Sequence, residues 1–302
     1  MSAAPRWVIH RSNVNAWDCD ENGHLNVRYY ISKNAQGLTH LLAELGLSPS
    51  RLAELGLRPR LAAQHVRYQR EARVAAPLVG SGQFVGVDDR RLSVYSELLN
   101  SMDGTLYTTF NSDIEFRDAD GKRVAPPVRP EGIAAVVPEH GAIRSLPATA
   151  KPDLSVAAAL AAGYVETGRG TVMADECDRA GRLEAYQYAA RIADAIPNLM
   201  STLQTPAEFA LRAEGELGGA VIESRAVYHE ELHAGERFVL LSGLRSFAAK
   251  TMHLSHLMFS LDTNALAFSS AGIGVALDLR TRRAVPFAAE RQALMRERLV
   301  TA

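Results

Sequence analysis

The chain contains two related copies of one segment. Residues 14–35 align with residues 172–193 at an offset of 158, and eight of these 22 positions are identical. The identical pairs are Val14/Val172, Ala16/Ala174, Cys19/Cys177, Asp20/Asp178, Gly23/Gly181, Leu25/Leu183, Tyr30/Tyr188 and Ala35/Ala193. Further pairs at an offset of 160 are Tyr68/Tyr228, Glu71/Glu231, Arg123/Arg283 and Pro126/Pro286. A repeat of this length indicates two copies of one module of about 130 residues.

The segment between the copies is rich in proline. Six of the 13 prolines fall within residues 125–161, where each of them interrupts regular hydrogen bonding. We therefore expect a first domain at residues 1–125, a crossing linker at 126–161 and a second domain at 162–302.

Each copy has the same predicted order of elements, one strand and one long helix followed by a run of strands. In the first copy we expect a strand at Val8–Ala16 and a helix at about His24–Leu45, where apolar residues recur at helical spacing. The strands that follow are expected at Gln64–Arg70, Gly80–Val87, Leu92–Asn100 and Thr105–Phe116 in the first copy and at Val221–His229, Arg237–Leu244, Thr251–Ser260 and Ala265–Ala276 in the second. This order predicts an α+β fold with two antiparallel sheets, each wrapped around a long central helix.

Composition excludes several classes of function. The formal net charge of −1 shows no basic excess for nucleic acid. The sequence has neither a signal peptide nor a run of apolar residues long enough to span a membrane, so a cytoplasmic location is expected. The two cysteines, Cys19 and Cys177, occupy equivalent positions and are expected to pack rather than react; no metal site is expected.

Residues 17–30 carry a family resemblance. They read Trp-Asp-Cys-Asp-Glu-Asn-Gly-His-Leu-Asn-Val-Arg-Tyr-Tyr, and this resembles the signature of the 4-hydroxybenzoyl-CoA thioesterase-like hotdog family, an acidic turn followed by Gly-His-x-Asn and a helical aromatic residue. Acyl-ACP thioesterases, which are double hotdogs, carry a similar Asp-x-Asn-x-His-x-Asn. The resemblance implies a tandem hotdog fold, thioester hydrolysis, and functional roles for Asp20, Asn22 and His24. Residues 68–71 resemble a later family segment that carries a further acid, here Glu71.

The chemistry of these residue types fits thioester hydrolysis. Asp20 is expected to act as general base or nucleophile, with Glu71 sharing the base role and His24 assisting proton transfer. Backbone N–H groups of Gly23 and His24, at a helix N-terminus, are expected to stabilise the oxyanion, and Asn22 and Asn26 to hold the substrate or the Asp20 carboxylate. The structural alternatives are helix capping by Asp20 or Asn22, a purely structural His24, and a salt-bridged Glu71.

The second copy keeps the carboxylate but not its neighbours. Asp178 is present, whereas Asn22, His24 and Asn26 are replaced by Ala180, Arg182 and Glu184. We therefore expect one working site per chain, in the first copy. Arg179 or Arg182 would then bind a phosphate of the substrate.

Three functions compete at this stage. The first is hydrolysis of a small-molecule acyl-CoA, with CoA as part of the substrate, no separate cofactor, and a monomeric or homodimeric protein. The second is hydration or dehydration of an enoyl- or hydroxyacyl-CoA by a hotdog enzyme. Such sites usually carry Asp-x-Asn-Pro-x-His, whereas the segment from Asp20 to His24 has no proline and is one residue shorter, so this function is disfavoured. The third is a non-catalytic acyl-CoA binding module, against which the intact acidic turn argues. Both a CoA thioester and an acyl-carrier-protein thioester stay open as the substrate.

Overall fold

The computed structural model describes residues 6–134 and 136–301. The chain forms two compact units, Met1–Arg144 and Ser145–Ala302. The division falls inside the predicted linker. Within the described residues, no helix is both long enough and apolar enough to cross a membrane.

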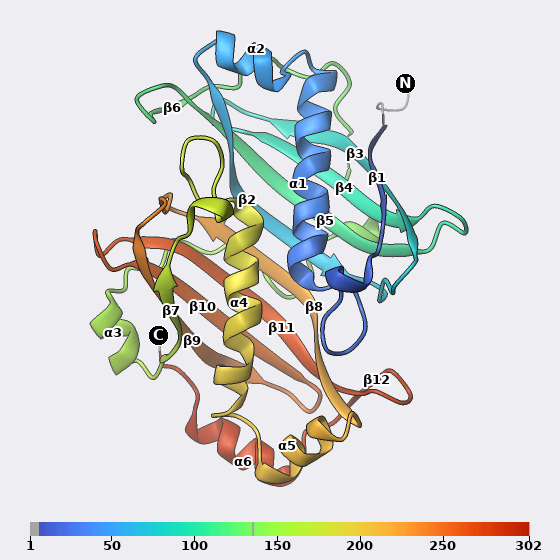
Figure 1. The fold of residues 1–302 in the computed structure, drawn as a ribbon, viewed down its shortest axis with the longest axis vertical. Helices are drawn as coiled ribbons and strands as arrows, with labels where there is room; N and C mark the ends of the chain where they lie inside the picture. The colour runs from blue at the N-terminus through green and yellow to red at the C-terminus, as the bar shows by residue number, and fades with distance from the viewer. Residues whose placement is uncertain (1–5, 135, 302) are drawn as a thin grey trace. The chain divides into compact units, whose positions relative to one another are not determined.

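The first unit is an antiparallel sheet with a long helix against one face (Figure 1). Its strands follow the order β1–β3–β4–β5–β2, and β6 pairs with β5. The bounds are β1 Trp7–Asn13, β2 Arg58–Tyr68, β3 Pro77–Val87, β4 Leu92–Asn100, β5 Leu106–Arg117 and β6 Arg123–Val124. The central helix α1 spans Val27–Glu44, and a short helix α2, Pro49–Glu54, follows it.

The second unit repeats this arrangement. Its strands follow the order β8–β11–β10–β9–β7, and β12 pairs with β11. The bounds are β7 Val165–Thr171, β8 Leu217–Tyr228, β9 Arg237–Phe247, β10 Thr251–Ser260, β11 Leu266–Asp278 and β12 Arg283–Val285, with helices α3 Val156–Ala161, α4 Ala185–Met200, α5 Pro206–Ala213 and α6 Ala289–Glu297. The predicted tandem of two antiparallel sheets, each with a long helix, is confirmed.

Most predicted strands overlap an observed strand, but their first and last residues differ. The strands predicted at Leu92–Asn100 and Thr251–Ser260 match β4 and β10. The predicted helix start at His24 is wrong, because α1 begins at Val27. The side chain of Asn26 accepts a hydrogen bond from Arg28 N–H at 3.0 Å and thereby caps the helix.

The linker contains more regular structure than its prolines predict. Helix α3 lies within residues 125–161, and Ser155 caps it by accepting a hydrogen bond from Ala158 N–H at 3.2 Å. The segment around His140 is held on the first unit, since Arg67 donates to the carbonyl oxygen of His140 at 2.7 Å. Asn111 donates to the carbonyl oxygen of Gly141 at 2.8 Å. This part of the linker is therefore fastened to the sheet.

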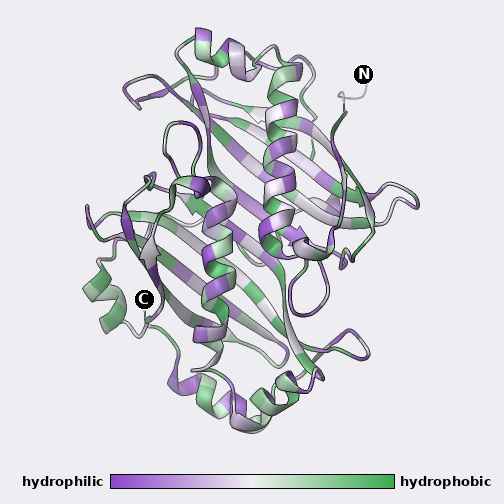
Figure 2. Cartoon of the chain, viewed as in Figure 1, coloured by the Kyte–Doolittle hydropathy of each residue, from purple (hydrophilic) through white to green (hydrophobic). Residues whose placement is uncertain are grey.

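Apolar residues between α1 and the sheet form two clusters, and hydrophobic and hydrophilic residues are interspersed along the strands (Figure 2). The motif-side cluster contains Val14, Leu25, Tyr30, Val66, Ala72, Leu78, Leu98, Tyr107 and Phe110. The far cluster contains Ile9, Leu38, Leu41, Leu42, Leu47, Leu52, Phe84, Leu92, Val94, Ile114 and Phe116. The motif-side cluster includes Leu25 of the Asp20 segment, so packing of the core and placement of that segment are coupled.

Candidate active site

The Asp20 segment is a tight turn built by its own backbone. Asp20 N–H donates to the carbonyl oxygen of His24 at 2.9 Å, and Gly23 N–H donates to the carbonyl oxygen of Asp20 at 3.0 Å. The Asp20 carboxylate accepts a further hydrogen bond from Asn22 N–H at 2.9 Å. Gly23 has φ of 75°, a left-handed conformation that a glycine adopts without steric cost. The sequence Asp-x-x-Gly therefore fixes the position of the Asp20 carboxylate.

His24 lies directly against this carboxylate. His24 Nδ1 is 3.1 Å from Asp20 Oδ2, and the two side chains are only 13% and 14% exposed. The other ring nitrogen, Nε2, is buried and has no hydrogen-bond partner within the described part of the chain. The structure thus brings together Asp20 and His24, the predicted base and the predicted proton-transfer residue.

Burial sets the ionisation of Asp20. It raises the pKa of Asp20 above the ordinary value of an aspartate, because desolvation disfavours the charged form. His24 and the backbone N–H groups of Asn22 and His24 lower the pKa, but they offset the burial only in part. A carboxylate with a raised pKa is a better proton acceptor when ionised, which suits a general base.

Asn22 and Gly23 support the site through their backbone N–H groups, and Asn26 supports it through its side chain. Asn22 is buried, with 7% of its surface exposed, and its N–H holds the Asp20 carboxylate. The N–H of Gly23 is taken up by the Asp20 carbonyl group, which gives Gly23 a turn-forming role in place of the oxyanion role suggested by the sequence. The Asn26 side chain caps α1, so the capping function falls to Asn26 and not to Asp20 or Asn22.

Glu71 reaches the site on a loop that is hydrogen-bonded to the motif. Leu25 N–H donates to the carbonyl oxygen of Ala72 at 2.8 Å, and the backbones of His24 and Arg73 form an isolated β-bridge. The Glu71 carboxylate is 27% exposed and pairs with Arg73 at 3.1 Å. The salt bridge with Arg73 agrees with a structural role for Glu71. The loop that carries Glu71 nevertheless lies beside His24.

The Tyr30 hydroxyl group has a structural role that its place in the motif does not reveal. Tyr30 is 4% exposed, and its hydroxyl accepts a hydrogen bond from Ala72 N–H at 3.0 Å. Burial raises the pKa of Tyr30. In the second copy, the hydroxyl of Tyr188 accepts from Leu232 N–H at 3.2 Å. The identity of Tyr30 and Tyr188 in the repeat was the signal for this shared anchor of the loop.

Asp18 is a structural residue beside the site. Its side chain is 5% exposed and lies 3.3 Å from Lys33 Nζ on α1, which is 9% exposed. Asn15 N–H also donates to the Asp18 carboxylate at 3.3 Å. The second copy has the corresponding pair Glu176 and Arg191. This pair therefore ties the turn to the central helix in both copies.

Replacing Lys33 with methionine tests this structural role. Lys33→Met leaves the Asp18 carboxylate buried without its cation, and we expect the free energy of unfolding to fall by about 3 kcal/mol. Urea denaturation measures the change. The double variant Asp18→Asn/Lys33→Met removes both charges and should recover part of the loss. An unchanged denaturation midpoint in Lys33→Met would contradict the assignment.

The cysteines lie at equivalent places in the two turns. Cys19 Sγ is 3.6 Å from the carbonyl oxygen of Asn15, and Cys177 Sγ is 3.4 Å from that of Met173. Burial, followed by neighbouring carboxylates, raises the pKa of both thiols. A raised pKa leaves less of the reactive thiolate at neutral pH, which favours the predicted packing role.

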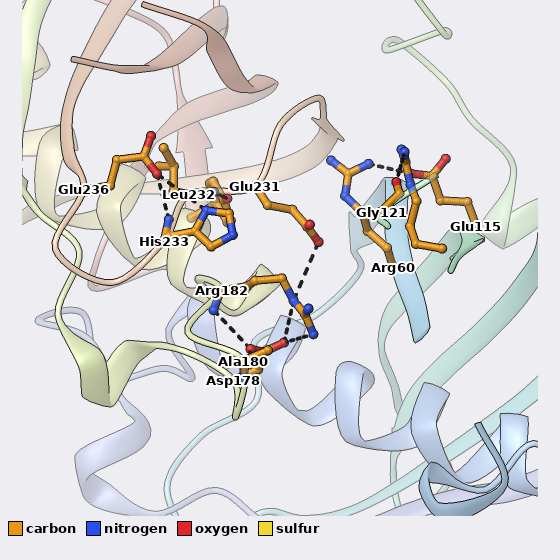
Figure 3. Close-up of polar contacts among 12 residues, drawn as sticks. Arg60, Glu115, Gly121, Asp178, Ala180, Arg182, Glu231, Leu232, His233 and Glu236 are labelled. Carbon is orange, nitrogen blue, oxygen red and sulfur yellow. Dashed lines mark hydrogen bonds and ion pairs between the residues drawn. The ribbon is translucent and has the colours of Figure 1, made fainter. Parts of the chain in front are cut away.

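The second copy builds the same turn around Asp178. Asp178 N–H donates to the carbonyl oxygen of Arg182 at 2.8 Å, Gly181 N–H donates to that of Asp178 at 2.9 Å, and Gly181 has φ of 74°. The Arg182 side chain is 2.7 Å from Asp178 Oδ2, and 4.0 Å from Glu231 (Figure 3). Arg182 lies between two carboxylates, which would compete with any phosphate for it; Arg179 is exposed.

The equivalent carboxylates differ in their electrostatics. Burial raises the pKa of Asp178, but hydrogen bonds from the Arg182 and Ala180 N–H groups and from the Arg182 guanidinium outweigh it, so the pKa lies below the ordinary value. The pKa of Asp20 is shifted in the opposite direction. The two turns thus have the same backbone conformation, but their carboxylates differ. The pKa of Asp20 is raised, whereas Asp178 is paired with the permanent positive charge of Arg182.

Comparisons with known proteins agree with this architecture. The family profile described as the thioesterase-like superfamily matches twice, at residues 14–137 and 172–295. A search of curated proteins gave no match.

Three solved structures share the fold over nearly the whole chain. A candidate oleoyl thioesterase from Lactobacillus plantarum has a TM-score of 0.66 at 14% identity, covering 94% of this chain and 98% of its own. An acyl-ACP thioesterase from Bacteroides thetaiotaomicron has a TM-score of 0.65 at 10% identity, covering 90% and 97%. The 12:0-ACP thioesterase from Umbellularia californica has a TM-score of 0.66 at 8% identity, covering 90% and 94%. With its duplicated hotdog fold and two family matches, the chain belongs to the thioesterase-like superfamily and is a thioester hydrolase by class.

Proposed function

We propose that this protein hydrolyses an acyl-CoA thioester to the free acid and CoA at a single site in its first unit. The observation that carries the proposal is the contrast between the two turns. Asp20 is paired with a histidine whose Nε2 atom has no partner within the described residues, whereas Asp178 is paired with an arginine. Histidine can exchange a proton near neutral pH and arginine cannot.

In the proposed reaction, the ionised Asp20 carboxylate takes a proton from water, and the resulting hydroxide attacks the thioester carbonyl carbon. The tetrahedral intermediate then expels the CoA thiolate, which takes up a proton. Direct attack by the Asp20 carboxylate, with later hydrolysis of an anhydride, is the alternative route to the same products. His24 assists the proton transfers, and Asn22 keeps the carboxylate in place through its N–H.

The oxyanion is assigned to backbone N–H groups at the N-terminus of α1. Val27 is the first residue of this helix, and no described residue accepts a hydrogen bond from its N–H. The first N–H groups of a helix have no partner within the helix, and the helix dipole favours negative charge there.

A panel of acyl-CoAs tests the proposed function. Purified protein is incubated with aliphatic and aromatic acyl-CoAs and with matched acyl-carrier-protein thioesters, while free thiol and enoyl absorbance are followed together. Release of thiol from CoA substrates, without a change in enoyl absorbance, is the expected result. Enoyl conversion without thiol release would indicate a hydratase, and binding without turnover across the panel would indicate a non-catalytic module; either result would overturn the proposal.

A further inference from the structure

A layer of polar side chains crosses the interior of the first unit between α1 and the sheet. It consists of Asn34 from α1, Ser96 from β4, Ser112 from β5 and Gln64 from β2. Their exposed fractions are 6%, 2%, 2% and 2%, respectively. The strand register brings three of them to one region of the sheet, because Gln64 faces Ser112, and Ser112 faces Val94, which is two residues from Ser96. Asn34 joins them from α1 through its hydrogen bond with Ser96.

The polar layer separates the two apolar clusters of the first unit. On each element, residues two apart on a strand, or four apart on a helix, share one face. Along that face, the polar residue stands between a member of the motif-side cluster and a member of the far cluster. The successions are Tyr30–Asn34–Leu38 on α1, Leu98–Ser96–Val94 on β4 and Phe110–Ser112–Ile114 on β5.

Two polar atoms of this layer lack a partner. Ser96 Oγ donates to Asn34 Oδ1 at 2.6 Å, and Gln64 Nε2 donates to Ser112 Oγ at 3.0 Å. These bonds leave the Asn34 Nδ2 donor and the Gln64 Oε1 acceptor buried without a hydrogen-bond partner within residues 6–134 and 136–301. A buried amide atom in this state destabilises the protein unless a water or a ligand completes its hydrogen bonds.

The second unit lacks this arrangement at the equivalent positions. Ile192 takes the place of Asn34, and Gly272 takes the place of Ser112. The second unit has a different buried polar group, in which Ser242 Oγ lies 2.7 Å from Thr167 Oγ1 and 2.8 Å from His256 Nδ1. The polar layer with a free donor and a free acceptor therefore belongs to the same unit as Asp20.

We propose that this layer recognises a hydroxyl group on the acyl chain, so that the substrate is an oxygenated acyl thioester rather than a plain alkyl one. A hydroxyl oxygen accepts a hydrogen bond from Asn34 Nδ2, and its proton is donated to Gln64 Oε1. Asn34 lies seven residues beyond Val27, which is about 10 Å along the helix. This inference rests on the proposed function, which places the thioester carbonyl at the N-terminus of α1.

The test compares pairs of acyl-CoAs of equal chain length, with and without a hydroxyl group at a range of distances from the carbonyl. For the wild-type protein, kcat/KM is expected to be at least tenfold higher for the hydroxylated member of one pair. Asn34→Leu replaces the amide with an apolar group of similar size and is expected to reduce this preference to one or below. Gln64→Leu provides a second variant that removes the acceptor instead of the donor.

Ser242→Ala serves as the matched control, because it removes a buried polar group from the second unit and should leave the preference unchanged. Equal kcat/KM for both members of every pair would overturn the inference and leave thioester hydrolysis standing. If the wild type released no thiol at all, the proposed function would fail instead. Calorimetric binding of the hydroxylated and plain acyl-CoAs to Asp20→Asn would then decide the inference, and equal affinities would overturn it.

Discussion

Asp20→Asn is expected to reduce kcat/KM for thiol release about a thousandfold, because it removes the group that activates water or attacks the carbonyl. Asparagine keeps the size of the side chain and the oxygen that accepts from Asn22 N–H, so the turn should persist. Steady-state kinetics with a thiol reagent measures the loss. The matched variant Asp178→Asn removes the equivalent carboxylate in the second copy and should leave turnover unchanged.

The same two variants should shift stability in opposite directions. The folded-state pKa of Asp20 is raised, so its stabilising contribution is present below the unfolded pKa and lost as pH rises through the folded pKa. At neutral pH, Asp20→Asn should therefore raise the thermal midpoint. The pKa of Asp178 is lowered, so its contribution is present above the unfolded pKa and lost as pH falls through the folded pKa. Asp178→Asn should destabilise the protein by about 1 kcal/mol at neutral pH.

Calorimetry of the wild type and both variants at pH 7 decides this point. Loss of turnover in Asp178→Asn, with normal folding, would show that the second copy takes part in catalysis. A lower thermal midpoint in Asp20→Asn would show that Asp20 is kept for stability.

His24→Arg should convert the first site into a copy of the second. The guanidinium would pair with Asp20 as Arg182 pairs with Asp178, and it would lower the pKa of Asp20. We expect kcat/KM at pH 7 to fall about a thousandfold, since the base becomes weaker and the proton-transferring imidazole is lost. The remaining activity should rise with pH at a lower pH than in the wild type, because Asp20 ionises earlier.

A pH profile of kcat/KM for the wild type and His24→Arg measures both effects. The control is His40→Arg, the same exchange on the exposed part of α1, where His40 pairs with Glu44 at 3.5 Å. This control should retain the wild-type rate and profile. An acid limb that moved to higher pH in His24→Arg would contradict the assigned coupling of His24 and Asp20.

The repeat made the fold predictable from sequence, since two aligned copies of one helix and its strands allow few arrangements. Positions that depend on local chemistry are also predictable, such as the proximity of Asp20 and His24 in one turn. The predicted start of α1 is too early because Asn26, which the motif assigns to the substrate or the Asp20 carboxylate, uses its side chain to cap the helix. The sequence pattern does not predict helices α2 and α5. They are short, and each begins at a proline, a residue that also marks the end of regular structure.

Features that depend on contacts between distant elements could not be predicted. The polar layer of Asn34, Gln64, Ser96 and Ser112 exists only through strand register and the rotation of α1. Likewise, the sequence predicts that Arg182 binds a phosphate of the substrate, because its ion-pair partners are not apparent from the sequence. Its two carboxylate neighbours come from the turn itself and from a loop about fifty residues away.

The two turns share their backbone hydrogen bonds, and this shared geometry distinguishes residues required for folding of the turn from residues proposed for catalysis. Asp178 receives the same backbone hydrogen bonds as Asp20, so the folding of the turn is a sufficient reason for an aspartate in the second copy, without any catalytic role. Under the proposed function, the aspartate alone therefore does not identify the catalytic turn of this chain, and the residue four positions later does. On that proposal, replacing Arg182 with histidine and Ala180 with asparagine is the shortest change that would give the second turn the catalytic side chains of the first.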